Sequence, residues 1–180
     1  MKSKIIAISA IAAGLTAIIL TVGIYVELFD LFALVISSAF VILPIYFKSY
    51  KGCIMSYLVG GILAMMFGGF NFFSLVLPSF FFFFGLYPVL SLFLRERKVK
   101  KWVYILIGLL WCVIYFYGAF FYYTEVMGLD FADFPTWLNW IEDYILIFIA
   151  VFGVVFYFIY DRYVLAIRLF IDKYLRRIIK

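Results

Sequence analysis

The chain has 180 residues, of which 69% are hydrophobic, 24% are aromatic and only 14% are charged; its mean hydropathy is +1.18. A water-soluble domain of this length cannot bury so much apolar surface, because a large part of its surface must face water. The composition therefore excludes an ordinary soluble globular protein. It predicts one membrane domain covering residues 1–180, with membrane lipids as partners and no nucleic acid.

The first uncharged apolar run covers residues 5–26 and follows Lys2 and Lys4. It exceeds the roughly 7–15 residues in the apolar core of a cleaved signal peptide. It also lacks a clear small-residue cleavage site before Glu27. We therefore expect the run to be retained as a transmembrane helix.

Small residues recur every four positions along this first run. One row comprises Ser9, Ala13 and Ala17, and a parallel pair comprises Ala10 and Gly14. Four-residue spacing stacks such residues on one helix face, which lets another helix backbone approach closely. The pattern predicts either packing within the bundle or docking of another membrane protein. In the docking case, we expect the row to face lipid in the isolated chain.

Five further uncharged runs are long enough, or nearly so, to cross the hydrocarbon core, which takes about 17–25 residues. They cover residues 31–47, 53–70, 72–94, 102–123 and 144–160. With the first run, they predict an all-α membrane protein built as a bundle of about six transmembrane helices. Phenylalanines 80–84 cover all sides of the fourth helix, which indicates packing and lipid contact.

The fifth run carries aromatic residues whose spacing places them on one side of a helix. These residues are Tyr104, Trp111, Tyr115 and Tyr122. The outer end of this face could stack on a planar ligand. The alternative is ordinary packing with anchoring at the membrane interface, for which tyrosine is well suited.

The segment 124–143 combines Asp130, Asp133, Glu142 and Asp143 with four large aromatic residues. Trp137, Trp140 and Tyr144 are spaced as neighbours on a helix, which predicts a short interfacial helix. The segment is typical of a lid over an outward-facing ligand site, with its acids attracting a cation or accepting hydrogen bonds from ligand hydroxyls. It is equally typical of an aromatic belt with solvated acids.

The C-terminal segment 161–180 has a basic amphipathic pattern. Asp161, Arg168, Asp172 and Arg176 recur mostly at four-residue spacing, and apolar residues fill another face. The pattern predicts an interfacial C-terminal helix that lies on the anionic inner leaflet with its basic side toward the headgroups. The alternative is a docking element for a cytoplasmic partner.

The basic residues predict an orientation. With six crossings, all 15 lysines and arginines fall on one side of the membrane, and seven of the ten acidic residues fall on the other. Lysine and arginine are retained on the cytoplasmic side. We therefore expect a multi-pass protein of the cell membrane with both termini in the cytoplasm.

Several functional classes are disfavoured by residues that the sequence lacks. There is no histidine, which excludes histidine-based metal sites and serine–histidine catalysis. No charged residue falls inside the predicted spans, which argues against a pump or channel. No Walker motif is present, so ATP could be used only by a partner. We expect no enzyme activity, no cofactor and no metal; acids of the outer loops are the only candidates for catalysis.

Three features resemble the substrate-binding S components of energy-coupling-factor (ECF) vitamin transporters, which are small six-helix membrane proteins with cytoplasmic termini. The first helix contains the AxxxA spacing, at Ala13 and Ala17, that this family uses to dock its coupling subunit. The segment 36–69 resembles the family's second and third helices, with Pro44 before a short basic turn and Gly52 after it. Overall length and topology are the third feature.

The resemblance implies a subunit that captures a vitamin-like small molecule outside the cell. A transmembrane coupling subunit and two ATPases would then drive release inward. The docking residues would be Ser9, Ala10, Ala13, Gly14 and Ala17. In the outer half, tryptophans would stack on the ligand while Asn and Glu side chains orient it; the candidates are Glu27, Asn71, Tyr122, Trp137, Asn139, Trp140 and Glu142. The alternative function is a non-enzymatic accessory or structural subunit of a bacterial membrane complex.

Overall fold

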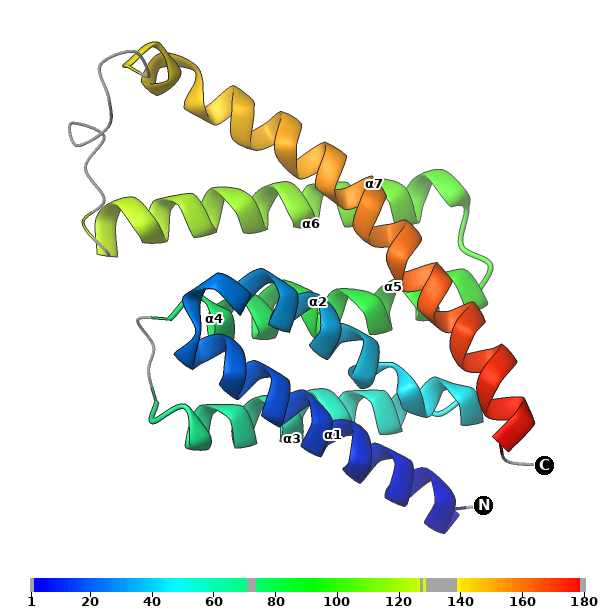
Figure 1. Ribbon diagram of the computed structural model, residues 1–180. Helices are drawn as coiled ribbons and strands as arrows, with labels where there is room; N and C mark the ends of the chain where they lie inside the picture. Colours follow the sequence, from blue (N-terminus) through cyan, green and yellow to red (C-terminus); the bar gives the residue numbers. More distant parts are fainter. Residues whose placement is uncertain (1, 71–73, 127, 129–138, 179–180) are drawn as a thin grey trace. The chain divides into compact units, whose positions relative to one another are not determined.

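The computed structural model describes residues 2–70, 74–126, 128 and 139–178, and these ranges contain helices and turns but no strand. Figure 1 shows the order of the helices along the chain. They are α1 (Lys2–Tyr25), η1 (Glu27–Phe29), α2 (Asp30–Val41), η2 (Leu43–Phe47), α3 (Tyr50–Phe67), α4 (Val76–Ser79), the π-helical η3 (Phe80–Phe84), α5 (Leu86–Glu96), α6 (Lys101–Phe121), the π-helical η4 (Tyr122–Val126) and α7 (Asn139–Ile178).

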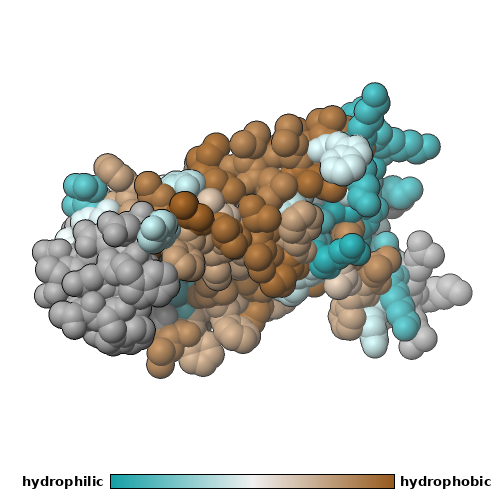
Figure 2. All heavy atoms as spheres, turned by 90° about the horizontal axis from the view of Figure 1, so that it is seen from above, coloured by the Kyte–Doolittle hydropathy of each residue, from teal (hydrophilic) through white to brown (hydrophobic). Residues whose placement is uncertain are grey.

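Within the described ranges, six helical stretches are long and apolar enough to cross a membrane. They are Ser3–Tyr25, Asp30–Phe47, Tyr50–Phe67, Val76–Glu96, Lys101–Glu125 and Tyr144–Tyr174. The prediction of an all-α protein with about six candidate spans is confirmed at this level. Broad hydrophobic areas cover the face shown in Figure 2, as expected of side chains that contact lipid.

The described helices divide into two compact units. The first contains residues 1–99 and 161–180, and the second contains residues 100–160. The sequence predicted a single domain and offered no linker composition at either boundary. The second boundary falls inside α7, so a continuous helix joins the two units.

Close packing of α1 against α3 forms the centre of the first unit. Ser9, Ala13 and Ala17 of α1 are all buried. On α3, a Cβ atom added to Gly60 would lie 2.9 Å from Thr16 Cβ and 3.1 Å from the Ala13 carbonyl oxygen. The small residues therefore let the two backbones approach closely, as such residues do between membrane helices.

The phenylalanine run forms a π-helical turn between α4 and α5. The backbone N–H of Gly85 donates to the Phe80 carbonyl at 2.8 Å, across five residues. Phe80, Phe83 and Phe84 are buried, whereas Phe82 is exposed. The run therefore combines core packing with an exposed apolar side chain, as its sequence indicated.

In the second unit, α6 packs against the first part of α7. The thiol of Cys112 donates to the Gly153 carbonyl at 3.4 Å, and the Tyr117 hydroxyl donates to the Leu146 carbonyl at 2.9 Å. Both α6 residues thus bond to backbone of the facing helix. Tyr157 lies against Gly108, where any Cβ would collide with its ring.

The segment predicted as a basic interfacial helix after residue 160 is helical, but it is continuous with the sixth candidate span; its position at the membrane interface stays a prediction. α7 continues as one helix through Ile178, and the sixth candidate span extends to Tyr174. The segment 161–178 contains neither glycine nor proline, so nothing in its sequence ends the helix. With these longer boundaries, Arg95 and Asp161 fall inside candidate spans, contrary to the expectation of charge-free spans.

Candidate functional site

Most of the predicted substrate-binding residues cannot be compared with the structure. Asn71 and Trp137 lie outside the described residues. The other five lie in helices that the structure describes. Among these five, the structure describes the side chain of Tyr122, which is half-buried at the start of η4. The side chains outside the description are those of Glu27, Asn139, Trp140 and Glu142. The substrate site therefore stays a prediction.

The predicted docking residues divide into a buried row and a more accessible pair. Ser9, Ala13 and Ala17 are buried, with Ser9 and Ala13 at the α1–α3 contact, so the expectation that this row faces lipid in the isolated chain is wrong for these three. At Ser9 and Ala13, the small side chains instead let α3 approach closely. Ala10 is exposed, and the space around Gly14 is open, with no atom within 4 Å of an added Cβ.

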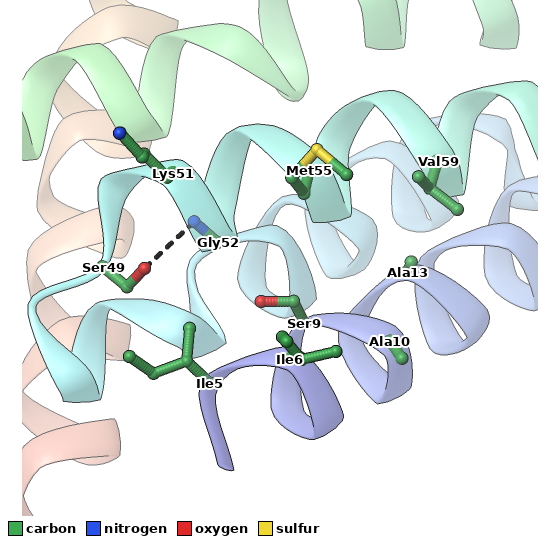
Figure 3. Close-up of a pocket in the computed structure, with 10 residues that line it drawn as sticks. All are labelled: Ile5, Ile6, Ser9, Ala10, Ala13, Ser49, Lys51, Gly52, Met55 and Val59. Atoms are coloured by element: carbon green, nitrogen blue, oxygen red, sulfur yellow. Dashed lines mark hydrogen bonds between the residues drawn. The ribbon is translucent and has the colours of Figure 1, made fainter. Parts of the chain in front are cut away.

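An apolar groove lies between α1 and α3, with a volume of about 330 Å³. Figure 3 shows its lining, which comes from the first turns of α1, the turn before α3 and the first half of α3. The lining residues are Ile5, Ile6, Ser9, Ala10, Ala13, Ser49, Lys51, Gly52, Met55 and Val59. Three of the five predicted docking residues therefore line one groove.

Polar atoms are few in this α1–α3 groove. Ser49 caps α3 by accepting a hydrogen bond from the Gly52 N–H at 3.1 Å. The Ser9 hydroxyl is buried and makes no hydrogen bond within the described part of the chain. It lies opposite Gly52, where an added Cβ would be 2.7 Å from Ser9 Oγ. Lys51 supplies the formal charge in the lining.

A polar cluster around Asp161 joins α7 to α5. The Arg95 guanidinium forms an ion pair with Asp161, with Nη2 2.5 Å from Oδ2. The hydroxyls of Tyr87 and Ser91 donate to Asp161 Oδ1 at 3.0 and 3.3 Å. The three α5 residues are spaced by four, so they share one helix face.

Within the first unit, a second ion pair and a hydrogen bond to backbone hold the last part of α7 against α5 and α2. Arg168 Nη2 lies 2.6 Å from Glu96 Oε1, and the Tyr163 hydroxyl donates to the Val35 carbonyl of α2 at 2.9 Å. Asp161 and Arg168 were predicted to face water or headgroups as part of the tail's polar face. Both bond to α5 instead.

Sequence reasoning did not predict the Asp161 cluster. The available signal was Tyr87, Ser91 and Arg95 at four-residue spacing on an otherwise apolar helix. A stripe of donors within an apolar helix indicates a buried acceptor, because an unpaired polar group in the interior is costly. Nothing in that stripe identifies the acceptor, since Asp161 lies 66 residues beyond Arg95.

These observations define the class of the protein as a candidate multi-pass α-helical membrane protein, with six helices long and apolar enough to span among its described residues. The comparisons go no further: no family model, curated protein or solved structure matches the chain. Within the described residues, no group of three or more potential metal ligands occurs.

Proposed function

We propose that this chain is the substrate-capturing subunit of an ATP-driven uptake transporter for a vitamin-like small molecule. Separate ATPase and coupling subunits supply the energy, and the chain itself carries out no chemical step. The proposal places both termini in the cytoplasm, so the basic ends of the helices face the ATPases.

The α1–α3 groove is the observation that carries this proposal. A coupling subunit needs an apolar surface lined by small side chains, so that one of its helices can pack closely against it. Ala10 is exposed and lines this groove beside the small residues Ala13 and Gly52. The resemblance to ECF S components assigns coupling to the same row of small residues.

The outer substrate site in this proposal comprises the predicted aromatic, amide and acidic residues. Trp137 and Trp140 stack on the ligand, and Asn139 and Glu142 orient it by hydrogen bonds. Attraction by the acidic residues favours a ligand with a cationic or hydroxyl-rich part.

One observation favours the second candidate, an accessory or structural subunit of a membrane complex. Ser9, Ala13 and Ala17 are already covered inside the chain. The AxxxA spacing is therefore accounted for by packing inside the first unit. In this alternative, the outer segment binds protein or lipid.

Native mass spectrometry of the tagged protein, purified gently from its own host, tests the proposal. The expected result is a complex containing a coupling subunit and a pair of ATPases, or the chain with a retained vitamin-sized mass. Recovery of the chain with lipid alone, or with an unrelated membrane protein, would favour the accessory-subunit alternative.

A matched pair of variants tests the role of the groove in the same purification. Ala10→Trp fills the groove, whereas Ile11→Trp changes the neighbouring residue, which is 59% exposed and does not line the groove. We expect Ala10→Trp to reduce recovery of the coupling subunit at least about tenfold, a loss of about 1.4 kcal/mol of affinity. Ile11→Trp should leave recovery unchanged; equal recovery with both variants would exclude the groove as the docking surface.

A further inference from the structure

A polar cavity of about 330 Å³ lies in the first unit, where η2, α5 and the last part of α7 meet. Its walls comprise Ile45, Tyr46, Lys48, Glu96, Arg168 and Asp172. Two side chains are cationic and two are anionic, so the formal charges of the lining cancel. A cavity of this kind is matched to a ligand that itself carries both charges.

The position of the cavity along the helices indicates the depth of its occupant. Lys48 is the first residue after the second candidate span, and Glu96 is the last residue of the fourth. Arg168 and Asp172 are near the end of the sixth, whose 31 residues exceed the roughly 20 that a crossing needs. Where such spans end, hydrocarbon gives way to lipid headgroups. Pockets with basic residues at this level bind lipid headgroups in other membrane proteins.

The charged groups of the cavity retain unused bonding capacity. Arg168 bonds to Glu96 through Nη2, and a guanidinium has five N–H donors. The side chains of Lys48 and Asp172 make no ion pair or hydrogen bond within the described part of the chain. The turn that carries Lys48 is fixed, because its backbone N–H donates to the Ile45 carbonyl at 2.7 Å.

We propose that this cavity binds a phosphoethanolamine group. Lys48 and Arg168 bind the phosphate, for which the planar guanidinium fork is well suited. Asp172 and Glu96 accept hydrogen bonds from the primary ammonium. Phosphatidylethanolamine presents this group at the depth of the cavity, and soluble phosphoethanolamine compounds carry the same chemistry.

A headgroup series tests the ligand class on the unmodified protein. Phosphatidylethanolamine and its mono-, di- and trimethylated forms differ only at the ammonium, where each methyl group replaces one N–H donor. In native mass spectrometry of the full chain in detergent, we expect retention to fall with each methyl group, by about tenfold over the series. Phosphatidylglycerol, which lacks an ammonium, should also bind more weakly. Equal retention across the methylated series would overturn the proposal.

Single variants locate the binding within the cavity. Lys48→Gln should weaken retention of every lipid in the series, whereas Asp172→Asn should abolish the discrimination between the primary and quaternary ammonium forms. Lys173→Gln is the charge-matched control, because Lys173 is exposed and does not line the cavity. If Lys48→Gln and Lys173→Gln behave alike, the cavity is not the site.

A competition experiment separates the two sources of the group. Displacement of the lipid by soluble glycerophosphoethanolamine would assign the cavity to a soluble ligand, and resistance to displacement would assign it to the membrane lipid. This site does not depend on the proposed transport function. A negative result for the headgroup site would leave the transport proposal unaffected, and a negative result for transport would leave the headgroup site unaffected.

Discussion

The carboxylate of Asp161 is only 13% exposed and accepts bonds from three side chains of α5. An ionised carboxylate in such a position is stable only when its oxygens are bonded, because taking a charge out of water is costly. Tyr87, Ser91 and Arg95 provide those bonds. The cluster therefore fixes the rotation of the last part of α7, within the first unit, about its axis relative to α5.

Replacing Asp161 by Ala should destabilise the first unit by about 1–3 kcal/mol, since Arg95 would keep its charge in a mostly buried site without a partner. The measurement is the free energy of unfolding in mixed micelles. Arg162→Ala is the control, because Arg162 is exposed on the same turn. The double variant Arg95→Met, Asp161→Ala should recover part of the stability that Asp161→Ala loses. If Asp161→Ala lowers the free energy of unfolding no more than Arg162→Ala does, the ion pair has no stabilising role.

Trp140 is the residue of the proposed substrate site whose loss is most informative. Replacing it by Ala should weaken binding of the captured small molecule about tenfold, because stacking and apolar burial are lost, while expression stays normal. Phe158→Ala on the same helix, at a 49% exposed position, should not alter binding. Unchanged affinity in Trp140→Ala would remove Trp140 from the site.

At the scale of the elements, small residues decide which helices pack most closely. The α1–α3 contact brings Thr16 Cβ and the Ala13 carbonyl against the face of Gly60. The hydroxyl of Ser56 on α3 donates to the Ser9 carbonyl of α1 at 3.0 Å. The α1–α3 interface therefore combines close approach of the two backbones with an interhelical hydrogen bond. Both features stabilise the association of membrane helices.

Gly60→Ala should destabilise the first unit by about 1–3 kcal/mol, since the added methyl requires α1 and α3 to separate. Gly14→Ala introduces the same methyl where an added Cβ meets nothing within 4 Å. It should therefore be neutral or slightly stabilising, because alanine favours a helix by up to about 1 kcal/mol over glycine. Thermal unfolding in detergent distinguishes the two; equal effects would contradict the close approach of α1 and α3.

At the scale of the whole molecule, the distribution of charge bears on topology. Lys48 lies between the second and third candidate spans and Lys51 is at the start of the third, whereas Arg95 is at the end of the fourth and Arg97 directly follows it. Lysine and arginine near span ends determine orientation during insertion. The prediction of cytoplasmic termini rests on this bias.

A topology experiment tests that orientation. A fluorescent reporter that matures only in the cytoplasm should be active when fused after Lys180. A reporter that is active only outside should report when inserted between residues 129 and 138. The reverse pattern would contradict the predicted orientation, and activity of one reporter at both positions would contradict a membrane crossing by the sixth candidate span, which separates the two positions.

The number and approximate extent of the candidate spans could be predicted from the residues alone, because hydropathy and length are sums over neighbouring residues. The small-residue rows of the first helix could be predicted in the same way, since four-residue spacing fixes a shared face. The packing of the helices was needed to show that Ser9, Ala13 and Ala17 are buried while Ala10 is exposed. The structure was also needed to show that Asp161 pairs with Arg95 and that the last helix continues past Tyr160. These outcomes depend on side chains far apart in the chain, and a local pattern identifies a face without identifying what covers it.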